Sequence, residues 1–95
     1  MTATLSGVFC FDGADPLYEG HFPGNPVVPG SLVVEAFYKR LQEAGHAPIE
    51  AKNFRFRSFV PPGSYPYTVR CENGRAACRL FHGETPAVTG EMVLP

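Results

Sequence analysis

The stretch YEGHFPGNPVVPGSLVVEA spans residues 18–36 and joins a Gly/Pro-rich loop to an apolar segment. Six of the eleven residues from Gly20 to Gly30 are glycine or proline. This density restricts the path of the backbone and prevents the regular hydrogen-bond pattern of a helix or strand. His21 is the only histidine of the first 45 residues, and Glu35 is the single carboxylate of the apolar run. A rigid loop that holds a histidine relative to a carboxylate on the next helix predicts an active site. The alternative is a histidine with a packing or surface role.

The segment behind this loop is predicted to be a helix. Ser31 suits the N-cap, and no glycine or proline interrupts the chain until Gly45, so the pattern predicts about 14 helical residues, or about 21 Å. Two interpretations of Glu35 stay open. It either faces solvent and pairs with Lys39 at i,i+4, or it lies at the edge of an apolar pocket, where desolvation favours the protonated form that a general acid needs.

The remaining chain predicts an antiparallel sheet. Strands are expected over residues 5–11, 49–59, 65–71, 76–81 and 87–94. Phenylalanines at 54 and 56 alternate with arginines at 55 and 57, which is typical of a half-buried strand. Asn73-Gly74 predicts a tight hairpin. One helix followed by an antiparallel meander indicates an α+β fold in which the sheet packs on the helix, in a single domain over residues 1–95.

Composition and charge narrow the possible partners. No stretch approaches the ~18 apolar residues of a membrane span, and three cysteines without CxxC spacing suit reduced thiols in the cytoplasm. The three histidines have no metal-ligand spacing. All eight Lys and Arg residues lie between Lys39 and Arg79, so they either form a patch for an acidic partner or are solvated strand faces. With eight basic and nine acidic residues, the composition does not indicate a nucleic-acid-binding protein.

Residues 20–30, GHFPGNPVVPG, followed by Leu32, Glu35 and Ala36, resemble the 3-hydroxyacyl-acyl-carrier-protein dehydratases of bacterial fatty-acid synthesis. Residues 54–63, FRFRSFVPPG, look like the strand and turn after the helix in that family. The resemblance covers about half of the chain. It implies a hot-dog fold, in which a curved antiparallel sheet wraps one central helix. It also implies a homodimer with sheets joined edge to edge, in which each active site takes its histidine from one subunit and its carboxylate from the other.

The resemblance also implies roles for individual residues. His21 is the base that removes the α-proton, Glu35 is the acid that protonates the departing hydroxyl, and the Gly30 N–H polarises the thioester carbonyl. Substrate-binding positions are Phe22, Pro23, Gly24 and Pro29, and carrier-protein contacts are Arg55 and Arg57. The substrate is a thioester of acyl carrier protein or coenzyme A, and no metal or other cofactor is implied.

Two departures from the family bear on activity. The family usually has glutamine one turn after its carboxylate, whereas this chain has Lys39, whose charge favours an ionised carboxylate. Much of the N-terminal segment of typical members is also missing. A thioesterase on the same fold, with Glu35 activating water or attacking directly, is an alternative. A non-catalytic acyl-binding or partner subunit, in which Lys39 neutralises Glu35, is another.

Overall fold

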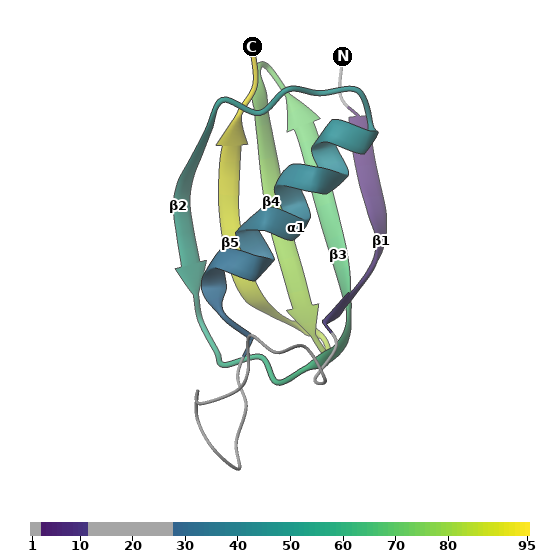
Figure 1. Ribbon diagram of the computed structural model, residues 1–95, viewed down its shortest axis with the longest axis vertical. Helices are drawn as coiled ribbons and strands as arrows, with labels where there is room; N and C mark the ends of the chain where they lie inside the picture. The colour runs from purple at the N-terminus through teal and green to yellow at the C-terminus, as the bar shows by residue number, and fades with distance from the viewer. Residues whose placement is uncertain (1–2, 12–27) are drawn as a thin grey trace.

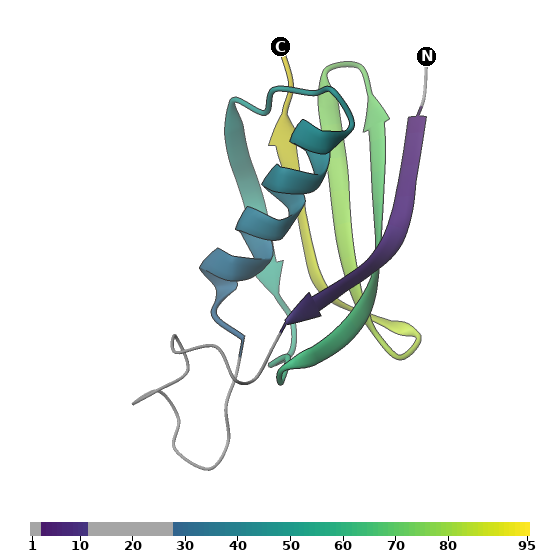
Figure 2. The same cartoon turned by 45° about the vertical axis from the view of Figure 1, so that its right-hand side comes forward.

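The computed structural model describes residues 3–11 and 28–95. These residues form one helix, α1 (Gly30–Glu43), and five strands. The strands are β1 (Ala3–Phe11), β2 (Glu50–Phe56), β3 (Gly63–Glu72), β4 (Arg75–His82) and β5 (Thr85–Val93). They pair antiparallel in the order β1-β3-β4-β5-β2, and α1 lies along one face of the curved sheet (Figures 1 and 2). The predicted α+β architecture, with a sheet wrapped on one helix, is confirmed.

Two tight hairpins join the three central strands. Asn73 and Gly74 have φ angles of 49° and 75°, and two successive positive φ angles are what a type I′ turn requires. The predicted Asn-Gly hairpin between β3 and β4 is therefore confirmed. Between β4 and β5, Gly83 supplies a φ of 69° at the first turn position. Both turns follow the right-handed twist of their strands, which keeps the sheet curved around α1.

The core forms between α1 and the inner face of the sheet. Val33, Phe37 and Leu41 of α1 are almost completely buried, at the helical spacing that defines one side of the helix. An aromatic cluster lies beneath that side. The ring of Phe9 stacks on that of Tyr67 at 3.9 Å, and both rings meet Phe37 edge-on. Burial of this helical stripe fixes the rotation of α1 and so determines which of its residues face outward.

The start of the helix differs from the prediction. The sequence predicts Ser31 as the N-cap, but Pro29, two residues earlier, occupies the cap without a side-chain hydrogen bond, and the helix begins at Gly30. Pro29 has φ −59° and ψ 140°, the extended backbone that proline favours, and its carbonyl accepts a hydrogen bond from the Leu32 N–H at 3.0 Å. Pro29, rather than Ser31, therefore sets the start of the helix. Gly45 follows the helix with a φ of 91°, which confirms the predicted glycine stop.

Edge strand β2 carries a bulge. The pairing with β5 shifts between Lys52 and Arg55, and Asn53 adopts a φ of 55°. After the bulge, the ring of Phe54 lies against Gly90 on the inner face, while Arg55 stands opposite Thr89 on the outer face. The predicted alternation of phenylalanine and arginine is confirmed. The strand ends at Phe56, three residues before the predicted end.

Candidate active site

The described part of the chain contains five of the predicted site residues: Pro29, Gly30, Glu35, Arg55 and Arg57. The other four, His21, Phe22, Pro23 and Gly24, lie outside the described residues.

The N-terminus of α1 is held by contacts with a distant part of the chain. The backbone N–H of Val28 donates to the carbonyl of Val60 at 2.7 Å, which ties the entry of the helix to the connection between β2 and β3. The first turn of α1 contains no acidic residue. A helix N-terminus carries partial positive charge and N–H groups without helical acceptors, so this end can stabilise a developing oxyanion.

Gly30 lies against the aromatic ring of Phe56 from the end of β2. A Cβ on Gly30 would stand 2.8 Å from Cζ of Phe56, closer than real Cβ contacts, so only glycine fits without displacement of the ring. Phe56 is 49% exposed and forms a wall beside the first turn of the helix. The resemblance to the dehydratases implies a role for the backbone N–H of Gly30. The need for a residue without a side chain comes from this packing.

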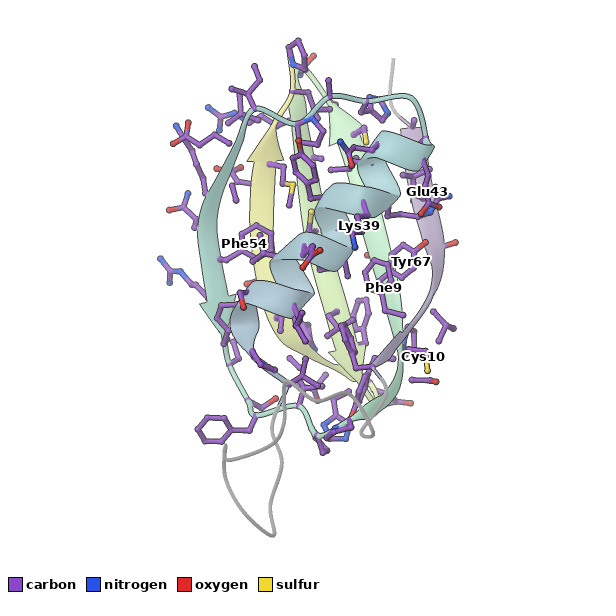
Figure 3. All side chains as sticks on the ribbon, viewed as in Figure 1. Phe9, Cys10, Lys39, Glu43, Phe54 and Tyr67 are labelled. Carbon is purple, nitrogen blue, oxygen red and sulfur yellow. The ribbon has the colours of Figure 1, made fainter. Side chains whose placement is uncertain are left out.

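Glu35 lies on the side of α1 that points away from the sheet. Its carboxylate Oε1 is 2.9 Å from Lys39 Nζ, and the two side chains are 51% and 65% exposed. Figure 3 shows Lys39 on this outward side of the helix. In a single chain, Glu35 therefore faces solvent and pairs with Lys39 at i,i+4, which is the first of its two predicted interpretations. Such an exposed pair contributes only a few tenths of a kcal/mol.

The two predicted carrier contacts lie on the opposite side of the sheet from α1. Arg55 is on the outer face of β2 opposite Thr89, and the backbone N–H of Arg57 donates to the Ala87 carbonyl at 2.8 Å. Both side chains are exposed. Arg55 and Arg57 are therefore separated from Glu35 by the sheet. Arg57 is nevertheless the next residue along the chain after Phe56, whose ring contacts Gly30.

Other titratable groups of the described residues are poor candidates for catalysis. Burial, reinforced by the neighbouring Cys71, raises the pKa of the Cys78 thiol to about 12, and burial also raises the pKa of Cys71. Thiols with raised pKa values are weak nucleophiles. Among residues 3–11 and 28–95, no three His, Cys, Asp or Glu side chains come together to hold a metal ion. In the same residues, no helix is long and apolar enough to cross a membrane.

Two features of the structure were not apparent from the sequence. Arg40 Nε donates to the Tyr67 hydroxyl at 2.8 Å and ties α1 to β3. Arg79 of β4 stands opposite Thr89 of β5, which in turn stands opposite Arg55 of β2. Only strand register brings Arg79 and Arg55 onto the same row of the sheet, because they are far apart along the chain.

Comparison with known proteins gives matches over most of the chain. Residues 3–88 match the family described as ApeI-like, ApeI dehydratase. The chain is 31% identical over 102 aligned positions to 3-hydroxyacyl-acyl-carrier-protein dehydratase FabZ of Caulobacter sp. (strain K31), covering 95% of this chain and 62% of the relative. It is 36% identical over 84 positions to the same enzyme of Acetivibrio thermocellus, covering 78% and 56%. The chain thus spans less than two thirds of the length of these relatives.

The architecture also matches solved structures. The dehydratase heterocomplex ApeI:P from Xenorhabdus doucetiae superposes with a TM-score of 0.81 at 18% identity, over 96% of this chain and 86% of the other. An uncharacterized protein from Erwinia carotovora superposes with a TM-score of 0.71 at 19% identity, over 99% and 84%. At these identities the likeness concerns the fold, and it confirms the predicted hot-dog architecture.

Proposed function

The chain belongs to the ApeI-like dehydratase family, and from this premise we propose that it converts a 3-hydroxyacyl thioester to the trans-2-enoyl thioester and water. The observation that carries the proposal is the helix N-terminus at Gly30, closed by Phe56 on one side and followed by Glu35 on the same helix. His21 stands in the loop sequence that leads into this helix.

In the proposed reaction His21 takes the α-proton of the substrate, and the electron pair of that C–H bond forms the new C=C bond. The C–O bond to the 3-hydroxyl breaks, and Glu35 in its acid form protonates the departing oxygen, which leaves as water. Negative charge develops on the thioester oxygen during proton removal. The N–H of Gly30 stabilises that charge because it belongs to the open end of a helix. Phe22, Pro23, Gly24 and Pro29 bind the substrate, and no metal or other cofactor takes part.

A homodimer with a shared active site is part of the proposal. Glu35 is half exposed and points away from the core of its own chain, so a second subunit has to supply the apolar surroundings that a general acid needs. Strand β2 is an edge strand of the sheet, and Ile49 before it, Phe56 at its end and Phe59 after it are 68%, 49% and 80% exposed. Pairing of two β2 edges would cover this surface and remove an exposed strand edge. His21 of one chain would then work with Glu35 of the other.

The proposed substrate is carried on acyl carrier protein or coenzyme A, with Arg55 and Arg57 as carrier contacts. Relatives named for activity on acyl-carrier-protein substrates support the carrier form. The three cysteines are all free, which agrees with the proposed cytoplasmic location.

A second candidate, a non-catalytic partner subunit, is favoured by the ion pair of Glu35 with Lys39 at 2.9 Å. A carboxylate that is paired with a lysine side chain is not free to contact the substrate. Such a subunit would bind acyl chains or complete the site of another protein without turning over substrate in its own site.

One assay separates the two candidates. Purified protein is incubated with a 3-hydroxyacyl thioester and, separately, with the trans-2-enoyl thioester, and the ultraviolet absorbance of the enoyl group is followed. We expect turnover in both directions. His21→Ala and Glu35→Gln should each reduce the rate about 10²–10⁴-fold, because base and acid catalysis each contribute that much. His46→Ala and Glu43→Gln are matched controls, because both residues lie at the C-terminal end of α1, at the other end of the helix from Gly30. Absence of turnover by the parent protein, or parental rates in both site variants, would contradict the proposed reaction.

A further inference from the structure

The connection between β2 and β3, residues 57–62, lies at the same end of the molecule as the start of α1 (Figure 1). Its first residue is tied to β5, because the Arg57 N–H donates to the Ala87 carbonyl at 2.8 Å. Its sequence, RSFVPP, ends in two prolines, which have no backbone N–H to donate. The end of the connection can therefore be held only through its carbonyl groups and its side chains.

Two successive carbonyls of this connection accept hydrogen bonds from different parts of the chain. The Val60 carbonyl accepts from the backbone N–H of Val28 at 2.7 Å. The Pro61 carbonyl accepts from the hydroxyl of Tyr65 at 2.5 Å. We refer to these two acceptors below as the carbonyl pair. Because the peptide bond between them is planar and proline restricts φ of residue 61, a displacement of one carbonyl moves the other.

Tyr65 is anchored in the sheet. It belongs to β3, stands opposite Phe9 of β1, and is almost completely buried. Its ring lies 6.5 Å from that of Phe11 in β1 and meets His82 of β4 edge-on at 5.3 Å between centroids. A phenol has a pKa of about 10, so its hydroxyl is protonated and can donate at neutral pH. The Tyr65 hydroxyl is therefore a donor that the sheet holds at a fixed place beside the connection.

The hydrogen bond of Val28 passes this position on to the start of the helix. Val28 is buried and stands two residues before Gly30, with Pro29 between them at a φ of −59°. The helix start has no side-chain cap, and Val33 is the first residue of α1 that is buried. The ring of Phe56 beside Gly30 is half exposed. The first residues of α1 therefore depend on the carbonyl pair for their placement on the sheet.

Stabilisation of an oxyanion depends steeply on where its donors lie. Such donors act at about 2.7–3.1 Å from the position of the developing charge, and a misplacement of about 1 Å can cost on the order of 10²-fold in rate. A small shift of the helix start would leave the core of the protein in place and still take the Gly30 N–H out of this range. A hydrogen bond distant from the reacting atoms can thus control kcat.

We propose that Tyr65 is a positioning residue of the active site. Its hydroxyl fixes the carbonyl pair, and the carbonyl pair fixes the N-terminus of α1, where the Gly30 N–H stabilises the developing negative charge. This inference rests on the proposed function. It gives a tyrosine of β3 a role in the reaction that is exerted through the backbone and not through contact with the substrate.

Tyr67 provides a matched control in the same strand. It lies two residues further along β3, on the same face, and is also almost completely buried. Its hydroxyl also takes part in one hydrogen bond, from Arg40 Nε at 2.8 Å, but Arg40 belongs to the last turn of α1. Replacement by phenylalanine removes one hydroxyl and one hydrogen bond in either case. Only the bond of Tyr65 leads to the carbonyl pair.

Steady-state kinetics with a 3-hydroxyacyl thioester of coenzyme A compare the parent protein with Tyr65→Phe and Tyr67→Phe. Loss of an interaction that acts only in the transition state lowers kcat without raising KM. For Tyr65→Phe we expect kcat to fall at least about tenfold with KM within about twofold of the parental value, and for Tyr67→Phe we expect both values within about twofold. Circular dichroism verifies that each variant is folded. Equal losses of kcat in the two variants, or parental kcat in Tyr65→Phe, would overturn the inference.

Amide hydrogen exchange tests the same coupling without turnover. Nuclear magnetic resonance follows the N–H of Val28 and, as a reference, the N–H of His46, which donates to the Leu41 carbonyl at the other end of the helix. In Tyr65→Phe we expect exchange at Val28 to be at least about fivefold faster and exchange at His46 to stay within about twofold. Equal acceleration at both amides would indicate general loosening, and unchanged exchange at Val28 would show that Tyr65 does not hold the connection. Either result would overturn the inference.

The two measurements separate the inference from the proposed function. Turnover by the parent protein with parental kcat in Tyr65→Phe would refute the positioning role and leave the function standing. No turnover by the parent protein would refute the function, and with it the role of Tyr65 in the reaction. Faster exchange at Val28 alone would in that case still show that Tyr65 fixes the start of the helix.

Discussion

The ring of Phe54 packs against Gly90, and this contact joins edge strand β2 to the core. A Cβ on Gly90 would be 2.5 Å from Cγ of Phe54, and the same ring approaches Phe37 of α1 at 6.2 Å between centroids. Glycine weakens a strand because it offers no side chain to pack, and here the aromatic ring of the neighbouring strand fills that space. The bulge at Asn53 turns Phe54 inward and makes the contact possible.

Gly90→Ala should therefore destabilise the protein. The added methyl group has to displace a ring that is held by α1, and such overpacking costs about 1–3 kcal/mol. Urea unfolding would measure the change. A double variant, Phe54→Ala/Gly90→Ala, is the control, because it removes the clash. Its destabilisation should be smaller than the sum of the two single changes, and additive values would show that the ring and the glycine do not interact.

Gly30→Ala should affect activity more than stability. The methyl group would push the half-exposed ring of Phe56 away from the helix start, and a ring with that exposure can move at little cost. Any displacement reshapes the wall beside the Gly30 N–H, so we expect kcat to fall at least about tenfold while the free energy of unfolding changes by less than about 1 kcal/mol. Parental kcat in this variant would mean that the helix start is not in the site.

Tyr67→Phe should loosen the attachment of α1 to β3. The hydroxyl accepts the hydrogen bond of Arg40 Nε at 2.8 Å in a partly buried position. Hydrogen bonds of charged groups contribute about 1.5–3 kcal/mol, and partial exposure of Arg40 places the expected loss near the lower end. Tyr38→Phe on the exposed side of the helix should cost much less. Equal effects of the two changes in urea unfolding would show that the Arg40 bond adds nothing to stability.

Lys39→Gln tests whether the ion pair restrains catalysis. Removal of the ammonium group 2.9 Å from Oε1 leaves the Glu35 carboxyl without its ion-pair partner and free to contact substrate. The dehydration rate should then rise. Lys52→Gln on β2 is a matched control. A rate equal to that of the parent would indicate that Lys39 does not restrain the reacting carboxylate.

Mixing inactive variants tests the shared site. His21→Ala and Glu35→Gln homodimers each lack one group in both sites, whereas a mixed dimer has one site with both groups and one with neither. After random exchange about half of the dimers are mixed, so up to about a quarter of the parental sites should return. Mass spectrometry verifies the exchange. Verified exchange without recovered activity, or sedimentation of the active parent as a monomer, would rule out the shared site.

The sequence alone determined the local elements and the family. The glycine stop at Gly45 and the Asn73-Gly74 turn are short-range signals, set by the φ angles that each residue tolerates, and the structure confirms both. The match of the loop and helix to a dehydratase family likewise depends on residues that are neighbours in the chain. The rotation of the helix could be predicted too, because Val33, Phe37 and Leu41 share one side.

Only the tertiary structure decided what distant residues do together. Pro29 rather than Ser31 caps the helix, and Phe56 makes the glycine at position 30 necessary, because packing with the end of β2 sets that geometry. Strand register brings Arg79 into one row with Arg55, a pairing that local patterns cannot specify. Hydrophobic periodicity fixes which face of an element is buried, but the order and register of strands come from long-range pairing, which no short segment encodes.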